Sequence, residues 1–187
     1  GSVFITGGSA NNTYLTSPDG LTWTSHTLTG SSFILKFAAD VLGTVLAFGF
    51  AGGFLVSYVS TDAGVTWTPN NVVAGSSGVL TVAEYGAGLF IIVTQAGNLG
   101  NQYLTSPDGI TWTSRTVFSA TTNVSIKWNG TVFCALMFLS GNSTYYTSAD
   151  GITWTSRTLG VGNRIIPVNG LAVLGSLFFA TLTGTLG

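Results

Sequence analysis

A 14-residue phrase that occurs four times decides the fold of this chain. Residues 14–27 read YLTSPDGLTWTSHT, residues 103–116 read YLTSPDGITWTSRT, and residues 145–158 read YYTSADGITWTSRT. A looser copy, SYVSTDAGVTWTPN, occupies residues 57–70. The four tryptophans are 44, 45 and 42 residues apart, at Trp23, Trp67, Trp112 and Trp154. A period of this length indicates a repeat protein in which each unit is one supersecondary structure.

A second phrase, a glycine followed by an apolar run, recurs with the same period. It begins at Gly1, Gly43, Gly88, Gly130 and Gly175. We therefore divide the chain, predicted to be a single domain over residues 1–187, into units at about 1–42, 43–87, 88–129 and 130–174, and a partial unit at 175–187.

Each unit contains four short segments with strand character, which we call A to D in chain order. The expected A strands are 32–38, 79–85, 124–128 and 164–168, and the B strands are the glycine-led apolar runs. C ends in the Thr-Ser before each turn, and D begins at the Thr-Trp. β-Branched and aromatic residues dominate, and no window has a helical period. The prediction is an all-β propeller of four antiparallel four-stranded blades with a surplus C-terminal strand, or alternatively five blades.

The order of the strands raises the question of how the repeats close. The chain opens with strands B, C and D and closes with an A strand and a fifth B strand. We expect the A strand at 164–168 to complete the first blade. The surplus B strand caps the ring, starts a fifth blade, pairs with another copy of the chain, or marks this chain as a segment of a longer array.

The connection between strands C and D has a clear chemical basis. In Ser17-Pro18-Asp19-Gly20 the proline presets the first φ of a tight turn, and the glycine takes the left-handed position. The serine hydroxyl and the aspartate carboxylate can accept backbone N–H groups within the turn. We expect the tryptophan that follows to fold over the hairpin.

This phrase resembles the Asp-box, or bacterial neuraminidase repeat, Ser-x-Asp-x-Gly-x-Thr-Trp. The second copy fits that pattern in full, and the other three are one residue shorter between Asp and Gly. The resemblance implies a propeller with a structural box at the turn between the third and fourth strands, far from the catalytic face of the sialidases. The box residues are Ser17, Asp19, Gly20 and Trp23; Ser60, Asp62, Gly64 and Trp67; Ser106, Asp108, Gly109 and Trp112; and Ser148, Asp150, Gly151 and Trp154.

Composition narrows the range of partners. Charged residues make up 6% of the chain and the net charge is −1, so no basic cluster is available for nucleic acid or an anionic membrane surface. Residues 170–187 carry no charge, but they align with the repeats, so we predict two strands and no membrane insertion. Cys134 is the only cysteine and is predicted to be buried in a strand. Without clusters of ligands, no metal or cofactor is expected.

The inventory of reactive side chains argues against an enzyme. By resemblance, a sialidase active site needs three arginines, a Tyr–Glu pair and an aspartate, and no positions here match those motifs. Arg115 and Arg157 share one repeat position on the outermost strand. Glu84 and Asp40 are interpreted as solvated carboxylates near A–B turns, and His26 is expected on an exposed outer strand.

The remaining polar and aromatic residues give only candidates for binding. Tyr14, Tyr103 and Tyr145 recur before the turns, where they serve as sugar platforms or, as we favour, pack between blades. Lys127-Trp128 and its counterpart Lys36-Phe37 each place a cation beside an aromatic side chain. Both pairs are expected near the mouth of the propeller's central channel.

The predicted function is a non-catalytic, lectin-like or receptor-binding module that recognises a glycan or a surface receptor. The expected setting is extracellular or on a virion surface, as in a phage tail. A structural propeller that assembles with copies of itself or with virion proteins is the first alternative, and a glycoside hydrolase is the second.

Overall fold

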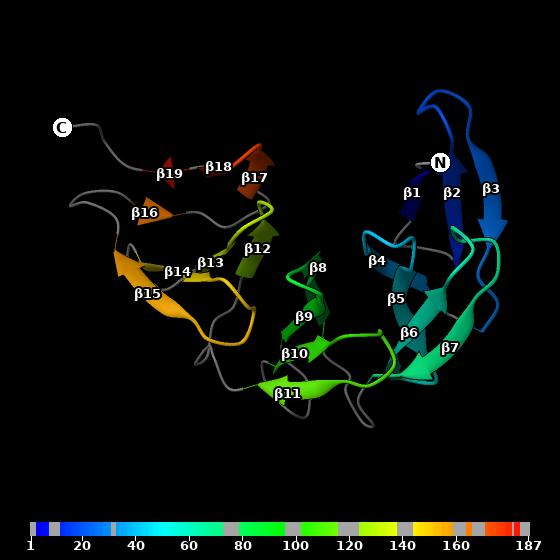
Figure 1. Cartoon of the computed structure of the whole chain (residues 1–187). Helices are drawn as coiled ribbons and strands as arrows, with labels where there is room; N and C mark the ends of the chain where they lie inside the picture. Colours follow the sequence, from blue (N-terminus) through cyan, green and yellow to red (C-terminus); the bar gives the residue numbers. More distant parts are fainter. Residues whose placement is uncertain are drawn as a thin grey trace. The chain divides into compact units, whose positions relative to one another are not determined.

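The structure, a computed structural model, contains only β-strands within the residues it describes (Figure 1). The described residues are 3–7, 12–30, 33–72, 79–95, 102–115, 124–137, 144–158, 164–165, 171–180 and 182–183. No helix in this part of the chain is long and apolar enough to cross a membrane. The predicted all-β class is confirmed.

The repeats form consecutive antiparallel sheets in which neighbouring strands follow one another along the chain. The first sheet has three strands, β1 (Phe4–Gly7), β2 (Thr13–Ser17) and β3 (Thr24–Thr27). The second has four, β4 (Phe33–Ala39), β5 (Val45–Ala51), β6 (Phe54–Ser60) and β7 (Thr68–Asn71).

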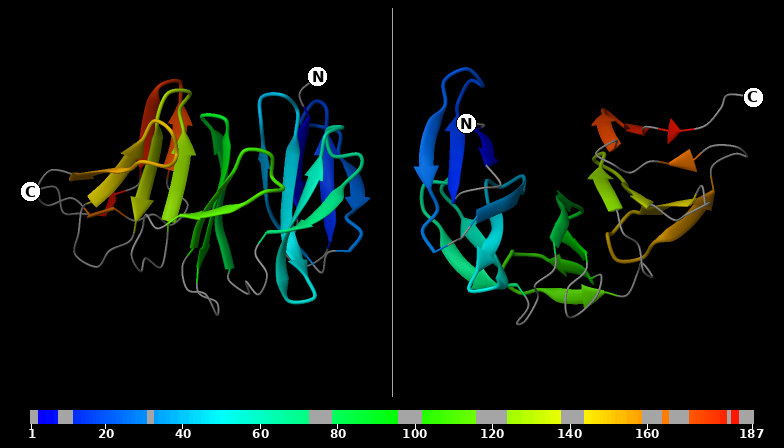
Figure 2. Two further views of the ribbon diagram at one scale, coloured as in Figure 1. Left: turned by 60° about the horizontal axis from the view of Figure 1, so that its bottom comes forward. Right: turned by 180° about the vertical axis from the view of Figure 1, so that it is seen from behind.

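Two more four-stranded sheets follow. The third consists of β8 (Val79–Gly86), β9 (Leu89–Gln95), β10 (Gln102–Ser106) and β11 (Thr113–Arg115). The fourth consists of β12 (Val124–Trp128), β13 (Phe133–Met137), β14 (Thr144–Ser148) and β15 (Thr155–Thr158). The predicted order of strands A to D is therefore confirmed in three sheets, and Figure 2 shows each as a twisted ribbon of neighbouring strands.

The C-terminal segment corrects the expected closure of the first blade. The A strand expected at 164–168 begins as β16 (Arg164–Ile165) but pairs with β19 (Leu182–Thr183), and residues 166–170 lie outside the described residues. β17 (Leu171–Leu174) pairs with β18 (Leu177–Ala180) across a tight turn. β19 follows β16 in the chain after the β17–β18 hairpin, so these four strands pair among themselves.

The chain folds as two compact units. The first unit comprises residues 1–77 together with the turn Ser106–Trp112, and the second comprises residues 78–105 and 113–187. The core of the first unit includes Tyr14, Leu28, Ala47, Val56 and Tyr58. The core of the second includes Val82, Ile91, Val93, Tyr103, Val124, Ile126, Phe133 and Ala135.

The second strands β5, β9 and β13 contribute long buried runs to these cores. In β9 all residues from Phe90 to Thr94 are buried, and β13 has a similar buried run from Phe133 to Leu136. A strand covered on both faces needs apolar residues at every position, which explains the nearly continuous hydrophobic runs of the sequence. Cys134 lies in such a run, buried as predicted, and burial raises the pKa of its thiol to about 11.

Candidate functional site

The four repeat turns, residues 17–23, 60–67, 106–112 and 148–154, share one hydrogen-bond pattern. In the first turn the Ser17 hydroxyl accepts the backbone N–H of Gly20 at 2.8 Å and donates to Asp19. The other Oγ–N distances are also 2.8 Å, from Ser60, Ser106 and Ser148. Gly20 has a φ of 77°, the left-handed conformation that glycine adopts without strain. The predicted turn chemistry is confirmed.

The turn aspartates are fully engaged by their own turns. Asp62 accepts hydrogen bonds from the side chain and backbone of Thr66 and from Ser60, and these lower its pKa to about 2. The backbone N–H groups of Thr153 and Ile152 lower the pKa of Asp150 to about 2. These carboxylates remain ionised and structural at neutral pH, which does not suit a general acid.

The repeated tyrosines connect one sheet to the turn of the next. Tyr14 on β2 donates a hydrogen bond of 2.7 Å to the Gly64 carbonyl, and Tyr103 on β10 donates to the Gly151 carbonyl. Ser57 takes the same position on β6 and donates to Gly109 at 2.9 Å. Each contact joins the third strand of one repeat to the turn of the following repeat.

The structure therefore corrects two of the three tyrosine binding candidates. Tyr14 and Tyr103 are each only 3% exposed, so their rings offer no platform to a sugar. The packing alternative accounts for both. Tyr145 is half-buried and packs against the cluster of Cys134, Leu136 and Leu171.

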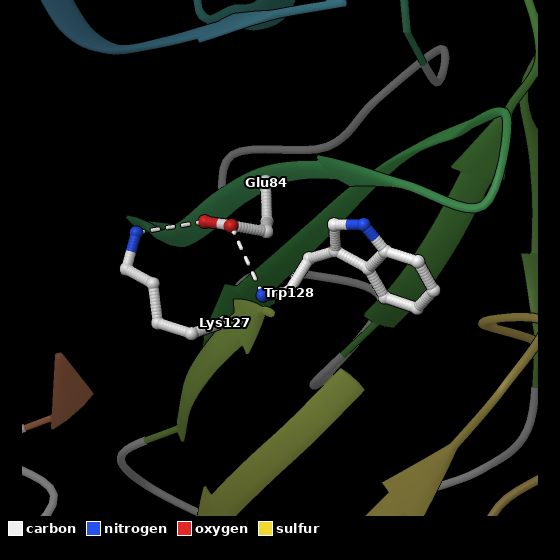
Figure 3. Close-up of polar contacts among 3 residues, drawn as sticks. All are labelled: Glu84, Lys127 and Trp128. Atoms are coloured by element: carbon white, nitrogen blue, oxygen red, sulfur yellow. Dashed lines mark hydrogen bonds and ion pairs between the residues drawn. The ribbon is translucent and has the colours of Figure 1, made fainter. Parts of the chain in front are cut away.

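Glu84 and Lys127 form an ion pair between the first strands of two adjacent repeats (Figure 3). Lys127 Nζ on β12 lies 2.7 Å from Glu84 Oε2 on β8, and Glu84 Oε1 accepts the backbone N–H of Trp128 at 3.2 Å. The Glu84 side chain is 14% exposed and that of Lys127 is 42% exposed. Glu84 is thus an anchored carboxylate, and the expectation of a solvated one was wrong.

Trp128 is mainly a packing residue. Its ring centroid lies 4.4 Å from that of Phe133, and its indole lies against Gly86, where any side chain would overlap it. Lys127 therefore remains the more accessible member of this candidate pair, with its ammonium already held by Glu84.

The second candidate pair does not occupy the equivalent place. On β12, Trp128 pairs with Phe133, and on β4 the residue at that register is Ala39, which pairs with Val45. Lys36 lies at a β-bulge further back on β4. Phe37 packs into the core of the first unit, with ring centroids 6.3 Å from both Tyr14 and Trp67. Lys36 and Phe37 lie three and two residues before Ala39, so the expected match with Lys127 and Trp128 was wrong.

Asp40 and His26 are also engaged locally. Asp40 Oδ1 accepts the backbone N–H groups of Leu42 and Thr44, both at 2.8 Å, and so shapes the β4–β5 turn. His26 is half-buried rather than exposed, because its ring stacks on Tyr14 at 4.9 Å and its Nε2 lies 2.8 Å from Thr16 Oγ1. Within the described residues, no three His, Cys, Asp or Glu side chains come together to hold a metal.

A groove of about 410 Å³ lies beside β1 in the first unit. Val3 and Ile5 form one wall, and Ala63 from the second repeat turn contributes as well. The opposite wall is the β4–β5 turn, represented by Ala39, Asp40, Val41, Gly43 and Val45. This feature has no counterpart in the sequence analysis.

Comparisons with known proteins identify the fold. No protein-family model and no curated protein matches the chain. Among solved structures, YCF48 bound to D1 peptide is 19% identical with a TM-score of 0.57, over 84% of this chain and 50% of that chain. The NanB sialidase from Streptococcus pneumoniae is 16% identical with a TM-score of 0.57, over 80% of this chain and 28% of that chain.

A GH74 enzyme from Niastella koreensis is 17% identical with a TM-score of 0.56, over 88% of this chain and 26% of that chain. The chain thus spans about half the length of YCF48 and about a quarter of the two enzymes. These neighbours are β-propellers, so the propeller fold is confirmed.

Two contacts between repeats were not predicted, although the sequence contains a signal for each. Glu84 and Lys127 are 43 residues apart, one repeat length, so repeat alignment alone would place them on adjacent first strands. The inter-repeat hydrogen bonds were missed because Ser57 replaces a tyrosine in the second copy, which hides the shared position.

Proposed function

We propose that this chain is a non-catalytic binding module whose four repeat turns are Asp-boxes with a purely structural role. One observation carries the proposal: all six carboxylates of the chain are engaged by the fold. Asp19, Asp62, Asp108 and Asp150 bind backbone N–H groups within their turns, Asp40 does so in the β4–β5 turn, and Glu84 binds Lys127. Hydrolysis of a glycoside requires two carboxylates facing a substrate across a set gap.

The burial of the tyrosines bears on the class of partner. The rings of Tyr14 and Tyr103, which were candidate platforms for a glycan, are buried and pack between repeats. A protein surface or a peptide is therefore the better-supported partner. A structural neighbour, YCF48, is described as bound to a peptide, so this fold is compatible with such a partner. We propose a receptor-type partner in an extracellular or virion setting.

Assay of the purified chain tests the non-catalytic proposal. We expect no turnover of aryl sialosides or of a panel of other aryl glycosides. Glu84→Gln provides the matched variant, because glutamine retains an acceptor for the Trp128 N–H while losing the charge. Turnover by the parent chain that disappears in this variant would overturn the proposal.

A second candidate function, assembly with other copies or with virion proteins, is favoured by one observation. The β17–β18 hairpin exposes an apolar set, Leu174, Leu177 and Phe179, although its other face packs on the core of the second unit. Clusters of exposed apolar side chains mark interaction surfaces.

A further inference from the structure

Two turns of the second sheet lie at the same end of that sheet. Its four strands follow one another and are antiparallel, so the turn after the first strand and the turn after the third strand are on one side. These are the β4–β5 turn and the repeat turn at residues 60–67. Val41 of the former and Ala63 of the latter line a common groove, which confirms that the two turns are neighbours.

The repeat turn at residues 17–23 lies at this end as well. Phe4, the first residue of β1, pairs with Ser17, from which this turn begins. Val3 precedes Phe4 and lines the groove together with Val41. The three turns therefore form one surface of the first unit, which we call the turn face.

The turn face presents large aliphatic side chains to solvent. Val41 and Leu42 are 87% and 88% exposed at the tip of the β4–β5 turn, and Leu21 and Val65 are exposed on the repeat turns. The second sheet has a repeat before it and a repeat after it in the chain, yet its three aliphatic side chains stay exposed. Ile110, the equivalent of Val65 in the third repeat, is exposed too.

Closure of these turns does not require apolar side chains. In a repeat turn the hydrogen bonds come from the serine, the aspartate and the glycine, and Val65 contributes its backbone N–H. In the fourth sheet, two residues, neither of them a large aliphatic, close the turn between Asn129 and Val132. The β4–β5 turn has three residues between Asp40 and Thr44, and two of them are aliphatic. Clusters of exposed apolar side chains that the fold does not use mark interaction surfaces.

The turn face is also negatively charged. The first unit contains four aspartates and one lysine. Asp19, Asp40 and Asp62 lie in the three turns, beside the aliphatic side chains, whereas Lys36 lies within β4. Hydrogen bonds lower the pKa of Asp62 to about 2, so this carboxylate is ionised at neutral pH. An apolar surface with fixed negative charges is complementary to an apolar surface that carries lysine or arginine.

The same charges disfavour two other occupants. A second copy that docked through its own turn face would bring aspartates against aspartates. A lipid surface with anionic headgroups would repel them in the same way.

We propose that the turn face is a docking surface for a partner protein whose own surface combines apolar side chains with lysine or arginine. Leu21, Val41, Leu42 and Val65 make the apolar contacts, and the turn aspartates select the basic partner. This inference rests on the proposed binding role and assigns it a surface and a class of partner.

The probe is an amphipathic peptide of two LKKLLKL heptads, titrated into the intact chain and followed by heteronuclear NMR. We expect saturable shifts at the amides of Leu21, Leu42 and Val65. A peptide of two LEELLEL heptads has the same leucines with the opposite charge, and should bind at least about tenfold more weakly.

Substitution of the aliphatic side chains locates the surface. The triple variant Val41→Ser, Leu42→Ser, Val65→Thr should weaken binding of the Leu/Lys peptide by at least about tenfold. Because all three side chains are exposed, the fold should be retained, which the dispersion of the amide spectrum verifies. Phe54→Ser is the matched control, because Phe54 is exposed beside the β5–β6 turn at the opposite end of the sheet, and binding should not change.

The contribution of charge is tested separately. Asp40→Asn retains the turn, because Asn129 caps the β12–β13 turn in the same way. It should weaken binding of the Leu/Lys peptide about two- to fivefold and leave a neutral peptide of LQQLLQL heptads unaffected.

Several outcomes would overturn the inference. These are no saturable binding of the Leu/Lys peptide, equal affinity for the Leu/Glu peptide, or binding that the triple variant leaves unchanged. Binding to vesicles of phosphatidylcholine and phosphatidylglycerol, or a dimer in sedimentation, that the triple variant abolishes would assign the turn face to lipid or to a second copy and also overturn it. Glycoside turnover is a separate readout, so failure of the proposed non-catalytic role would appear there and not in these titrations.

Discussion

At the residue scale, the chain uses its few charged groups as structural elements. Six carboxylates serve 187 residues, and each one satisfies backbone N–H groups or a lysine. Serine and tyrosine hydroxyls also form hydrogen bonds to backbone groups inside the fold. A buried polar group without a partner costs about 1–3 kcal/mol, so these contacts hold the irregular turns in place.

The turn aspartates predict the response of the chain to acid. Their folded pKa values, about 2 for Asp62 and Asp150, lie below the usual value, so their contribution to stability is complete above about pH 4 and is lost as the pH falls to about 2. We expect the free energy of unfolding to decrease across this window, as measured by urea denaturation at a series of pH values.

The double variant Asp62→Asn, Asp150→Asn is the control for that measurement. Asparagine keeps one acceptor oxygen and does not titrate, so the pH dependence between about 4 and 2 should become shallower. An unchanged slope would show that other groups dominate the acid response.

The tyrosine hydroxyls give a second prediction. Tyr103→Phe removes the hydrogen bond to the Gly151 carbonyl and should destabilise the chain by about 1–2 kcal/mol, because that carbonyl is left buried without this donor. Tyr145→Phe is the matched control, since within the described residues its hydroxyl makes no hydrogen bond, and a change below about 0.5 kcal/mol is expected. Equal losses in urea unfolding would contradict the proposed connection between repeats.

At the scale of the element, the repeat turn serves two purposes. It closes the hairpin between the third and fourth strands, and its glycine lies against the second strand of the preceding repeat. Gly109 lies against Leu46 of β5, and Gly151 lies against Ile91 of β9. The first turn has no preceding repeat within the described residues, and Trp23 is 42% exposed there.

Matched glycine substitutions separate these two purposes. Gly20 and Gly109 have nearly equal φ angles, 77° and 74°, so Gly→Ala costs the same backbone strain at both, about 1–2 kcal/mol. At Gly20 the new methyl group meets nothing closer than Phe4 at 3.7 Å, whereas at Gly109 it overlaps Leu46. Gly109→Ala should therefore cost about 1–3 kcal/mol more, as measured by urea unfolding. Equal costs would mean that the turn does not pack against the preceding repeat in solution.

At the scale of the whole molecule, exposed apolar side chains mark candidate interaction surfaces. Within the described residues, the β17–β18 hairpin exposes Leu174, Leu177 and Phe179. This feature supports the assembly alternative.

Assembly through the hairpin predicts a change in native mass on substitution. If the exposed face mediates self-association, Leu177→Ser with Phe179→Ser should shift the sedimentation equilibrium toward the monomer. Leu42→Ser is the control, because Leu42 is 88% exposed in the β4–β5 turn and lies outside the hairpin. A parent chain that is already monomeric at high concentration would remove the support for this alternative.

The sequence by itself determined the repeat period, the all-β class, the order of the strands and the chemistry of the turns. These features depend on contacts between residues close in the chain, such as Ser17 with Gly20. They also depend on strands whose apolar runs indicate that they are buried. Local interactions of this kind can be inferred from composition and spacing alone.

Only the tertiary structure decided which side chains meet across repeats. The Glu84–Lys127 pair and the Tyr14–Gly64 hydrogen bond join residues 43 and 50 positions apart. Contacts over such separations depend on how the sheets pack against one another, which local patterns of sequence do not specify. The pairing of 164–165 with β19, across the β17–β18 hairpin, was likewise not visible in the repeat pattern.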